Sequence, residues 1–361
     1  MQVAFFPRVE VYGDNPYWQI LKDGLQRAGV EICQTNDRLY LQWRWLVQNR
    51  SKTDVLHFHH LKHHYSVNDR RASYKSLSKF AAKVAFARLL GYRVVWTMHN
   101  LHPHERVKPE RVFHLTNWVL AQLANSVIVH CEYARQALSS YYGRRKGVIV
   151  IEHPNYIDAY PNAISRGQAR RKLAISDTDR VFLFLGAVRP YKGVEKLARV
   201  FGNLEQANLK LMVVGKMWDK DLEEQLKNLA AVDNRIGLYP DYVPDKDLQI
   251  YFNAADAVVL PYSEVLSSGS ALLAMSFSRA VIAPSIGCLK EVITENSGIL
   301  YDESDPDGLC RALKASLEVD LERLGSGAYS RAREFTWMRM VDRTLQAYGK
   351  KGTQQLEVLS S

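Results

Sequence analysis

Short apolar runs rich in β-branched residues recur along the first half of the chain, and longer stretches with helical spacing of apolar positions separate them. The runs predict strands, because β-branched side chains suit a buried, pleated surface. They are Val3–Phe6, Val55–Phe58, Arg93–Thr97, Ser126–Val129 and Val148–Ile151. The stretches between them predict helices at Trp18–Ala28, Ser76–Leu90, Phe113–Ala124 and Ala134–Tyr141.

The second half of the chain starts the same alternation afresh. Its predicted strands are Val181–Leu185, Leu211–Val214, Arg235–Leu238, Ala257–Leu260, Val281–Ala283 and Gly298–Tyr301. Alternating strands and helices indicate parallel sheets covered on both faces, so we expect an α/β protein of two Rossmann-like, doubly wound domains. Such sheets bind ligands at the carboxyl ends of their strands, and a cleft between the two domains is the expected site.

One segment interrupts both patterns. Asn155–Arg166 contains Pro161 and several turn-forming residues and predicts the linker between domains. The first domain is therefore expected over residues 1–162 and the second over residues 163–336. A final amphipathic helix is predicted at Trp337–Tyr348.

The charge of the chain is unevenly distributed. The 361 residues carry a net charge of +10; residues 1–162 contain 22 Lys and Arg against 12 Asp and Glu, whereas the remainder contains 26 of each. The surplus in the first half indicates a polyanionic partner, such as a membrane surface, or else an ordinary solvated basic surface.

Cysteine usage and hydropathy bear on location. The four scattered cysteines, Cys33, Cys131, Cys288 and Cys310, form no CxxC pair and are expected to be free thiols in a reducing compartment. The chain starts without a signal-peptide pattern, and its most apolar long window, residues 112–129, is interrupted by His114, Asn117, Gln122 and Asn125. We expect a cytoplasmic protein, with membrane association at the inner face left open.

A first chemical signal follows the first strand of the second half. In Gly186-Ala-Val-Arg-Pro-Tyr-Lys-Gly193, a glycine permits a close turn, and Arg189 and Lys192 stand where a helix begins. Backbone N–H groups at a helix start favour an anion, and an Arg and a Lys add a fork of donors and a point charge. This pattern suits a diphosphate, although two surface cations at a loop would look the same.

A second signal follows the strand Ala257–Leu260. Ser267, Ser268, Gly269 and Ser270 form a small, polar entry to an apolar helix, and Glu264 precedes them. Such an entry offers free backbone N–H groups to an anion, or serves only as a helix cap. The carboxylate of Glu264 is placed to accept hydrogen bonds from sugar hydroxyls.

Both signals in this order resemble the retaining, family 4-like GT-B glycosyltransferases, also called glycosyl transferases group 1. The resemblance covers nearly all of the second half and rests on these segments: Gly186–Gly193, Val213–Lys216, Ala255–Pro261, Ser270–Met275, Arg279–Pro284, Gly287, Glu291 and Gly298–Leu300. It implies two domains facing across a cleft, a C-terminal helix that crosses back to the first domain over about residues 337–361, and no metal or other cofactor.

The resemblance also implies roles for individual residues. Arg189 and Lys192 would bind the donor's diphosphate and stabilise the leaving group, and Glu264 would contact the donor as one of a glutamate pair. The remaining donor-binding residues would be Gly186, Gly215, Lys216, Ser267, Ser268, Gly269 and Ser270. The family's second glutamate, which contacts the ribose, is replaced here by Leu272 or Leu273. A leucine cannot accept a hydrogen bond, so the nucleotide base stays open between GDP and UDP.

In the first half, His99 follows the strand Arg93–Thr97, and the resemblance implies that it reaches the donor sugar or its reacting bond. A buried structural histidine is the alternative. His104 and Glu105 are secondary candidates for the acceptor side, or for orienting His99, and Arg8 is an acceptor-side candidate by position only.

Two further clusters in the first half are open to more than one interpretation. His57, His59, His60, His63 and His64 follow a strand, and their spacing allows zinc, although acceptor-side polar contacts are favoured because no cysteine or carboxylate completes a zinc site. A basic helical stretch has the composition of a helix resting on anionic lipid or of a charged soluble face; its cations are Arg70, Arg71, Lys75, Lys79, Lys83, Arg88 and Arg93.

Taken together, the sequence predicts a glycosyltransferase that moves a sugar from GDP or UDP to a glycan or lipid-linked acceptor with retention, in polysaccharide or glycolipid synthesis. A nucleotide-sugar epimerase or a phosphorylase is the alternative within the same fold. A basic polyanion-binding protein is a further alternative, although no nucleic-acid motif supports a nucleic-acid partner.

Overall fold

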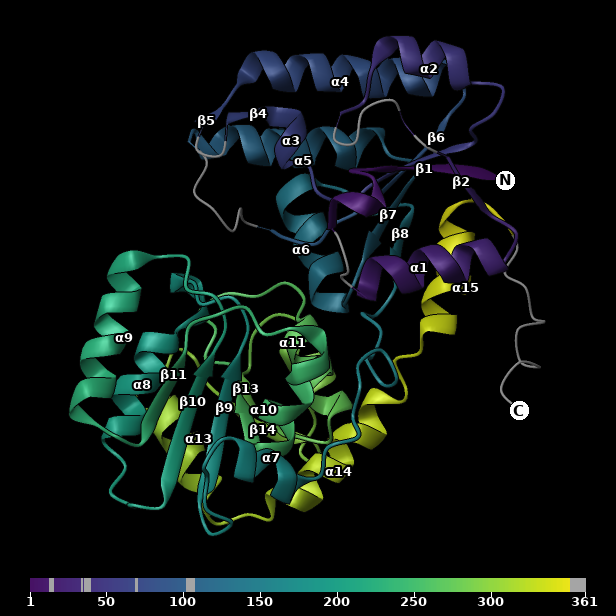
Figure 1. Cartoon of the computed structure of the whole chain (residues 1–361). Helices are drawn as coiled ribbons and strands as arrows, with labels where there is room; N and C mark the ends of the chain where they lie inside the picture. The colour runs from purple at the N-terminus through teal and green to yellow at the C-terminus, as the bar shows by residue number, and fades with distance from the viewer. Residues whose placement is uncertain (13–15, 34, 36–39, 69–70, 102–107, 351–361) are drawn as a thin grey trace. The chain divides into compact units, whose positions relative to one another are not determined.

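The computed structural model describes residues 1–12, 16–33, 35, 40–68, 71–101 and 108–350. The chain divides into two compact units, each built on its own parallel sheet (Figure 1). Unit 1 comprises Met1–Glu152 and Thr336–Ser361, and unit 2 comprises His153–Phe335.

Unit 1 is built on a six-stranded parallel sheet of order β2-β1-β3-β6-β7-β8. Its strands are β1 (Gln2–Phe6), β2 (Glu31–Ile32), β3 (Val55–Phe58), β6 (Arg93–Thr97), β7 (Ser126–Val129) and β8 (Val148–Val150). Its helices are η1 (Val9–Tyr12), α1 (Pro16–Arg27), α2 (Trp43–Asn49), α3 (Lys62–Tyr65), α4 (Tyr74–Leu89), α5 (Glu110–Leu123), α6 (Glu132–Tyr142) and α15 (Trp337–Ala347). A short antiparallel pair, β4 (Ser66–Asn68) and β5 (Arg71–Ala72), lies outside the sheet.

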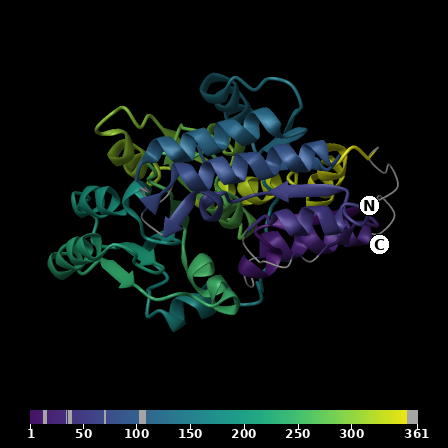
Figure 2. The same ribbon diagram turned by 90° about the horizontal axis from the view of Figure 1, so that it is seen from above.

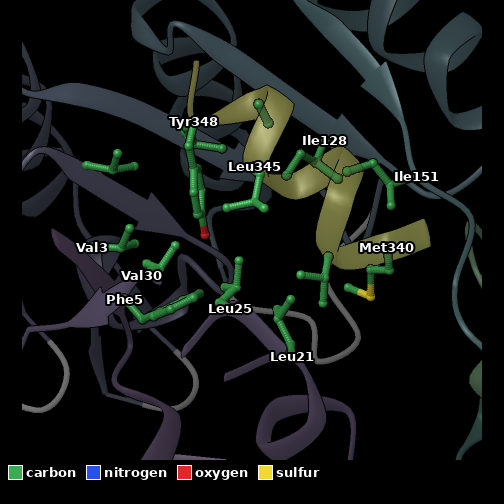
Figure 3. Packing of buried hydrophobic residues seen from close by; sticks show 14 of the residues in the cluster. Val3, Phe5, Leu21, Leu25, Val30, Ile128, Ile151, Met340, Leu345 and Tyr348 are labelled. Carbon is green, nitrogen blue, oxygen red and sulfur yellow. The ribbon is translucent and has the colours of Figure 1, made fainter. Parts of the chain in front are cut away.

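Helices cover both faces of the unit 1 sheet. Helices α4 and α5 pack side by side on one face (Figures 1 and 2). Helices α1 and α15 pack together on the other face, where Val3, Phe5 and Ile128 meet Leu345 and other apolar side chains of both helices (Figure 3). A Cβ atom on Gly24 of α1 would lie 2.5 Å from a methyl carbon of Val341 on α15, so a glycine is needed for this close approach. The C-terminal helix therefore belongs to unit 1.

The basic helix of unit 1 is α4, and several of its cations are used internally. Lys83 Nζ donates to the carbonyl of Leu41 at 2.6 Å, and Arg88 donates to the carbonyl of Leu123 at 2.8 Å. Its apolar face, which includes Phe80 and Val84, is buried. Within the described residues, no helix is both long and apolar enough to cross a membrane. The four cysteines are free thiols.

Unit 2 repeats the architecture with a six-stranded parallel sheet of order β11-β10-β9-β12-β13-β14. Its strands are β9 (Arg180–Leu185), β10 (Leu209–Val214), β11 (Ile236–Tyr239), β12 (Ala257–Val259), β13 (Ala280–Pro284) and β14 (Gly298–Tyr301). Its helices are α7 (Arg166–Lys172), η2 (Pro190–Lys192), α8 (Val194–Gly202), α9 (Lys220–Val232), η3 (Asp245–Asp247), α10 (Leu248–Ala254), α11 (Gly269–Ser276), α12 (Leu289–Val292), α13 (Gly308–Ala315) and α14 (Leu321–Ala332). The strand order reverses between β9 and β12, and that switch point is where open α/β sheets bind ligands.

The segment predicted as a linker is part of unit 2. The backbone N–H of Asn155 donates to the carbonyl of Phe335 at 2.8 Å, and its side chain donates to the carbonyl of Ala332 at 3.0 Å. The N–H of Ala163 donates to Gln249 Oε1 at 2.8 Å. Because these bonds tie the extended segment to helices of unit 2, the chain changes unit after residues 152 and 335 rather than after residues 162 and 336.

Candidate functional site

The loops that follow β9 and β12 meet at the switch point of the unit 2 sheet. A Cβ atom on Gly186 would lie 3.2 Å from Lys192 Nζ and 3.9 Å from Ser270 Oγ. Lys192 Nζ also lies 5.3 Å from the ring centroid of Tyr262, a cation–π distance. The ammonium group of Lys192 and the hydroxyl of Ser270 at the start of α11 therefore both lie close to Gly186.

Close backbone contacts hold these two loops together. Gly193 has a φ of +64°, and a Cβ atom there would lie 2.0 Å from the carbonyl oxygen of Pro261, so no other residue fits without a shift. The carbonyl of Tyr191 accepts hydrogen bonds from the backbone N–H of Ser263 at 3.0 Å and from its hydroxyl at 3.1 Å. The position of Lys192 is therefore set by the loop after β12.

The loop after β10 adds a third cation and an aromatic ring. Gly215 has a φ of +129°, and a Cβ atom there would lie 2.2 Å from the carbonyl oxygen of Gly186. Beyond it, Trp218 has a half-exposed ring that contacts two cations: Lys216 Nζ at 4.7 Å and the guanidinium carbon of Arg189 at 5.1 Å from the centroid. Sequence reasoning did not single out Trp218; its place two residues after Lys216 on a loop past a strand end was the available signal.

The N-terminus of α11 is capped by a side chain and contacts residues of the preceding segment. The hydroxyl of Ser268 accepts a hydrogen bond from the N–H of Ala271 at 3.2 Å and caps the helix. A Cβ atom on Gly269 would lie 3.1 Å from the hydroxyl of Tyr156 and 3.3 Å from His153 Nε2. Burial raises the pKa of the Tyr156 phenol, so it is a neutral hydroxyl at this entry. Sequence analysis missed His153 and Tyr156 because it assigned residues 155–166 to a linker and gave residue 153 no role.

The other predicted donor residues lie on the same loop and helix. Glu264 is exposed and Ser267 is partly buried. Of the two leucines at the place of the expected second glutamate, Leu272 is buried and Leu273 is half-buried. A cavity of about 510 Å³ lies elsewhere in unit 2, lined by residues including Lys172, Tyr239 and Tyr251, and no predicted site residue lines it.

The arrangement in unit 2 suits a small polyanion. Arg189, Lys192 and Lys216 come from two loops at one edge of the sheet, and a capped helix start stands beside them. Cations and free backbone N–H groups favour a phosphate group, and both would stabilise negative charge that develops on it.

The corresponding edge of the unit 1 sheet carries histidines. His59 Nδ1 lies 3.0 Å from His99 Nε2, which joins the ends of β3 and β6. His60 stacks on His99 with 4.7 Å between centroids, and His130, after β7, lies 5.3 Å from it. The structure thus gathers His99 with three other imidazoles.

A fifth histidine of this edge, His57, is fully buried. Its Nδ1 lies 2.7 Å from the hydroxyl of Tyr348 and its Nε2 lies 2.8 Å from the hydroxyl of Thr97. Burial lowers the pKa of His57 to about 3, and burial with the neighbouring imidazoles holds the pKa of His59 well below its usual range. Burial also lowers the pKa of His130. His57, His59 and His130 are therefore neutral near pH 7.

The remaining site residues predicted in the first half are Arg8, His104 and Glu105. Arg8 donates to the carbonyl of Thr35 at 3.3 Å and to the carboxylate of Glu10 at 3.1 Å. His104 and Glu105 lie outside the described residues. Over those described, no group of three or more His, Cys, Asp or Glu side chains could hold a metal ion.

Comparison with known proteins identifies the class of this fold. The model of the family described as glycosyl transferases group 1 matches residues 165–332. A GDP-mannose:glycolipid 4-beta-D-mannosyltransferase from Xanthomonas campestris pv. campestris is 30% identical over 300 residues, which cover 81% of this chain and 74% of that protein.

Solved structures agree in fold. Sucrose-phosphate synthase from Thermosynechococcus elongatus superposes with a TM-score of 0.76 at 17% identity, covering 97% of this chain and 98% of the other. HepE from Anabaena, in complex with UDP and glucose, gives a TM-score of 0.71 at 15% identity, covering 97% and 99%.

The fold is therefore the GT-B α/β fold predicted from the sequence, and the protein is a glycosyltransferase that uses nucleotide sugars. The chain belongs to the glycosyl transferases group 1 family.

Proposed function

We propose that the protein transfers a hexose from a GDP- or UDP-linked sugar to a glycan or lipid-linked acceptor, in polysaccharide or glycolipid synthesis. The observation that carries the proposal is the set of three cations on the loops after β9 and β10, at the carboxyl edge of the unit 2 sheet. Lys192 lies beside Gly186, which also lies near Ser270, and Arg189 and Lys216 contact the ring of Trp218. The name of the Xanthomonas relative, which specifies GDP-mannose and a glycolipid, supports a GDP-linked donor and a lipid-linked acceptor.

In this proposal the donor's diphosphate is held by unit 2. Arg189 and Lys192 pair with the phosphate oxygens, Lys216 adds charge, and residues 267–270 supply hydroxyls and backbone N–H groups. Gly186 and Gly215 are proposed to leave room for the phosphates, since side chains there would meet Lys192 and the Gly186 carbonyl respectively. As the sugar–phosphate bond breaks, charge grows on the leaving phosphate, and fixed cations stabilise it more than they stabilise the ground state.

The sugar and the acceptor are assigned to other groups. The exposed carboxylate of Glu264 is proposed to accept hydrogen bonds from sugar hydroxyls. His99 is proposed to contact the donor sugar or the reacting bond. His104, Glu105 and Arg8 remain predicted acceptor-side residues.

The stereochemical outcome is a separate proposal. Family resemblance favours retention, whereas the name of the Xanthomonas relative specifies a β-linked mannosyl product. The anomeric configuration of the product, measured from its one-bond carbon–hydrogen coupling, distinguishes retention from inversion. From an α-linked donor, an α-linked product supports retention and a β-linked product supports inversion.

The unit 1 surface is proposed to approach an anionic membrane when the acceptor is lipid-linked. Lys75, Lys79 and the apolar side chains of Tyr74 and Leu89 are exposed on α4. Co-sedimentation with phosphatidylglycerol vesicles tests this, with Lys75→Glu/Lys79→Glu expected to weaken it. Equal binding of wild type and variant would contradict the contact.

A thermal-shift panel of UDP, GDP, ADP and their sugar conjugates tests the donor proposal. A ligand that binds only the folded state raises the melting temperature. At a concentration 100 times Kd, it adds about 2.7 kcal/mol to the free energy of unfolding. One nucleotide series is expected to stabilise wild type and to lose its effect in Arg189→Ala. Arg199→Ala, an exposed cation on α8 paired with Glu195, is the matched control and should respond like wild type.

The panel is followed by a transfer assay with the stabilising donor. Stabilisation by no nucleotide, or equal stabilisation of wild type and Arg189→Ala, would overturn the assigned site. Turnover that needs free phosphate, or that interconverts sugars without an acceptor, would point to a phosphorylase or an epimerase.

A further inference from the structure

His59 occupies a fixed place beside His99. It follows β3, is 3% exposed, and its backbone N–H donates to the carbonyl of Phe6 at 2.9 Å. Its ring packs edge-to-face with Trp18 at 4.4 Å between centroids and stacks near Phe5 at 5.5 Å. Aromatic rings on two sides leave this imidazole little freedom to rotate, because buried side chains are close-packed.

The contact between the two imidazoles constrains both. A neutral imidazole has one nitrogen that donates and one that accepts, so His59 Nδ1 and His99 Nε2, 3.0 Å apart, share one proton. The tautomer of one ring then sets that of the other. His59 Nε2 is buried with no hydrogen-bond partner among the described residues, so Nδ1 makes the polar contact observed for this ring.

The surroundings of the pair are imidazoles and phenols. His57 and His60 come from the same strand end, His130 follows β7, and Tyr17 of α1 packs edge-to-face on His99 at 6.0 Å. Tyr348 of α15 contacts His57. The pKa of His59 is lowered first by burial and then by His57, His99, His60 and His130, so His59 is neutral at pH 7 and its Nδ1 can hydrogen-bond to His99.

We propose that His59 is a positioning residue that fixes the ring orientation and the tautomer of His99 through the Nδ1–Nε2 hydrogen bond. The inference rests on the proposed function only for its catalytic consequence, since the hydrogen bond itself is a property of the free protein. With its Nε2 hydrogen-bonded to His59, His99 has its ring orientation fixed and its tautomer tied to that of His59.

Two variants of His59 separate positioning from packing. An asparagine places its amide where the imidazole Nδ1 stands, and it can donate or accept, so His59→Asn keeps the contact with His99. A glutamine places its amide near the Nε2 position, so His59→Gln loses it. Both remove the aromatic ring and leave a polar amide of similar size, which makes them a matched pair.

The first readout is the tautomer of His99 in the full-length protein without ligand. In protein labelled with ¹⁵N-histidine, the His99 signals are identified by their loss in His99→Gln. Wild type and His59→Asn are expected to show one tautomer, and His59→Gln a mixture of both. A through-hydrogen-bond coupling between His59 Nδ1 and His99 Nε2 is expected in wild type.

The second readout is donor turnover against pH. Misplacing a reacting group by about 1 Å can cost on the order of 10²-fold in rate, so His59→Gln is expected to lower kcat by about that factor with little change in the donor KM. His59→Asn should restore most of kcat, and the pH profile of His59→Gln should differ from that of wild type.

Several outcomes would overturn the positioning role. They are a mixed tautomer of His99 in wild type, absence of the coupling in wild type, or an unchanged tautomer in His59→Gln. Equal loss of kcat in both variants would show a packing role instead. If wild type turns over no donor, the proposed function fails, but the tautomer measurement still tests the role of His59. If His59→Gln does not fold, the coupling measured in wild type still tests the hydrogen bond.

Discussion

The two units carry parallel sheets with the same number of strands, yet the carboxyl edges of those sheets differ in chemistry. At the unit 2 edge, the loops after β9 and β10 carry three cations: Lys192 lies beside Gly186 near the capped start of α11, and Arg189 and Lys216 contact the ring of Trp218. At the unit 1 edge, five histidines lie among aromatic rings, and burial keeps three of them neutral. One edge is cationic, whereas the other contains buried, neutral imidazoles.

The difference shows that topology sets where a site forms and side chains set what it does. Both edges lie where strand order places loops from adjacent strands together. The cationic edge suits the charged part of a nucleotide sugar. Neutral imidazoles donate and accept hydrogen bonds without a net charge, which suits hydroxyl groups of a sugar.

The largest expected effect comes from removing one cation of the unit 2 edge. Lys192→Ala should lower kcat by about 10²- to 10³-fold, because one donor aimed at developing charge is worth about that much. Lys196→Ala, which removes a partly buried cation of α8 paired with Glu303 at 3.3 Å, is the control and should leave the rate within about twofold of wild type. Steady-state transfer kinetics measure both. Equal rates for the two variants would remove the cationic edge from the reaction.

A second prediction tests whether the cationic edge depends on backbone contact. Gly193→Ala should destabilise unit 2 by about 3 kcal/mol, because its Cβ atom would overlap the Pro261 carbonyl. Gly29→Ala is the control, since Gly29 also has a positive φ, +74°, but nothing within 4 Å of its Cβ position. It should cost only about 1 kcal/mol for the left-handed backbone. Denaturant unfolding measures both, and equal costs would mean that the loop after β12 moves aside.

The buried histidines of unit 1 should make this unit sensitive to acid. His57 has a pKa of about 3 when folded and 6.5 when unfolded, so below pH 6.5 the unfolded chain binds the proton and the folded chain does not. Stability is therefore full above pH 6.5 and falls as the pH drops, by on the order of 2 kcal/mol at pH 5 for one such imidazole.

Hydrogen exchange locates this loss of stability. Amides of β3 should exchange faster at pH 5 than at pH 7 after correction for intrinsic rates, while amides of β10 change less, because His153 is the single histidine in the sequence of unit 2. His153→Gln is the control and should leave the β3 response intact. An equal response in both strands would contradict the proposed neutrality of the buried histidines.

The smallest expected effect concerns Trp218. Trp218→Leu removes the ring that contacts Arg189 and Lys216 and should weaken nucleotide binding about two- to fivefold, since a cation–π contact at an exposed site is worth about 0.5–1 kcal/mol. Trp218→Phe keeps an aromatic face and should lose less. Titration calorimetry with the nucleotide found by thermal shift measures both; tighter binding by Trp218→Leu would show that the ring obstructs the cations.

Buried strands were the most predictable part of the fold. The bounds predicted for Val55–Phe58, Arg93–Thr97 and Gly298–Tyr301 match the structure to the residue. Strands in a parallel sheet are apolar on both faces, so each is a continuous run with sharp ends. Helix α2 was not predicted, because Trp43 and Val47 are exposed and its apolar positions do not mark one buried face.

The candidate site was predictable where it follows strand ends in sequence. Arg189, Lys192 and residues 267–270 stand on loops that the alternation of strands and helices locates. Trp218, His153 and Tyr156 were missed, because their places beside Arg189 and Gly269 depend on contacts between distant segments.

By itself, the sequence determined the α/β class, the repeated alternation in each half, and the loops that carry cations and serines, because these follow from local periodicity and residue type. Only the tertiary structure decided that residues 153–162 belong to unit 2, that Leu272 rather than Leu273 is fully buried, and that His59 is hydrogen-bonded to His99. Each of these depends on which distant groups satisfy a backbone amide, fill a core position or share a proton, and such partners are chosen when the chain packs.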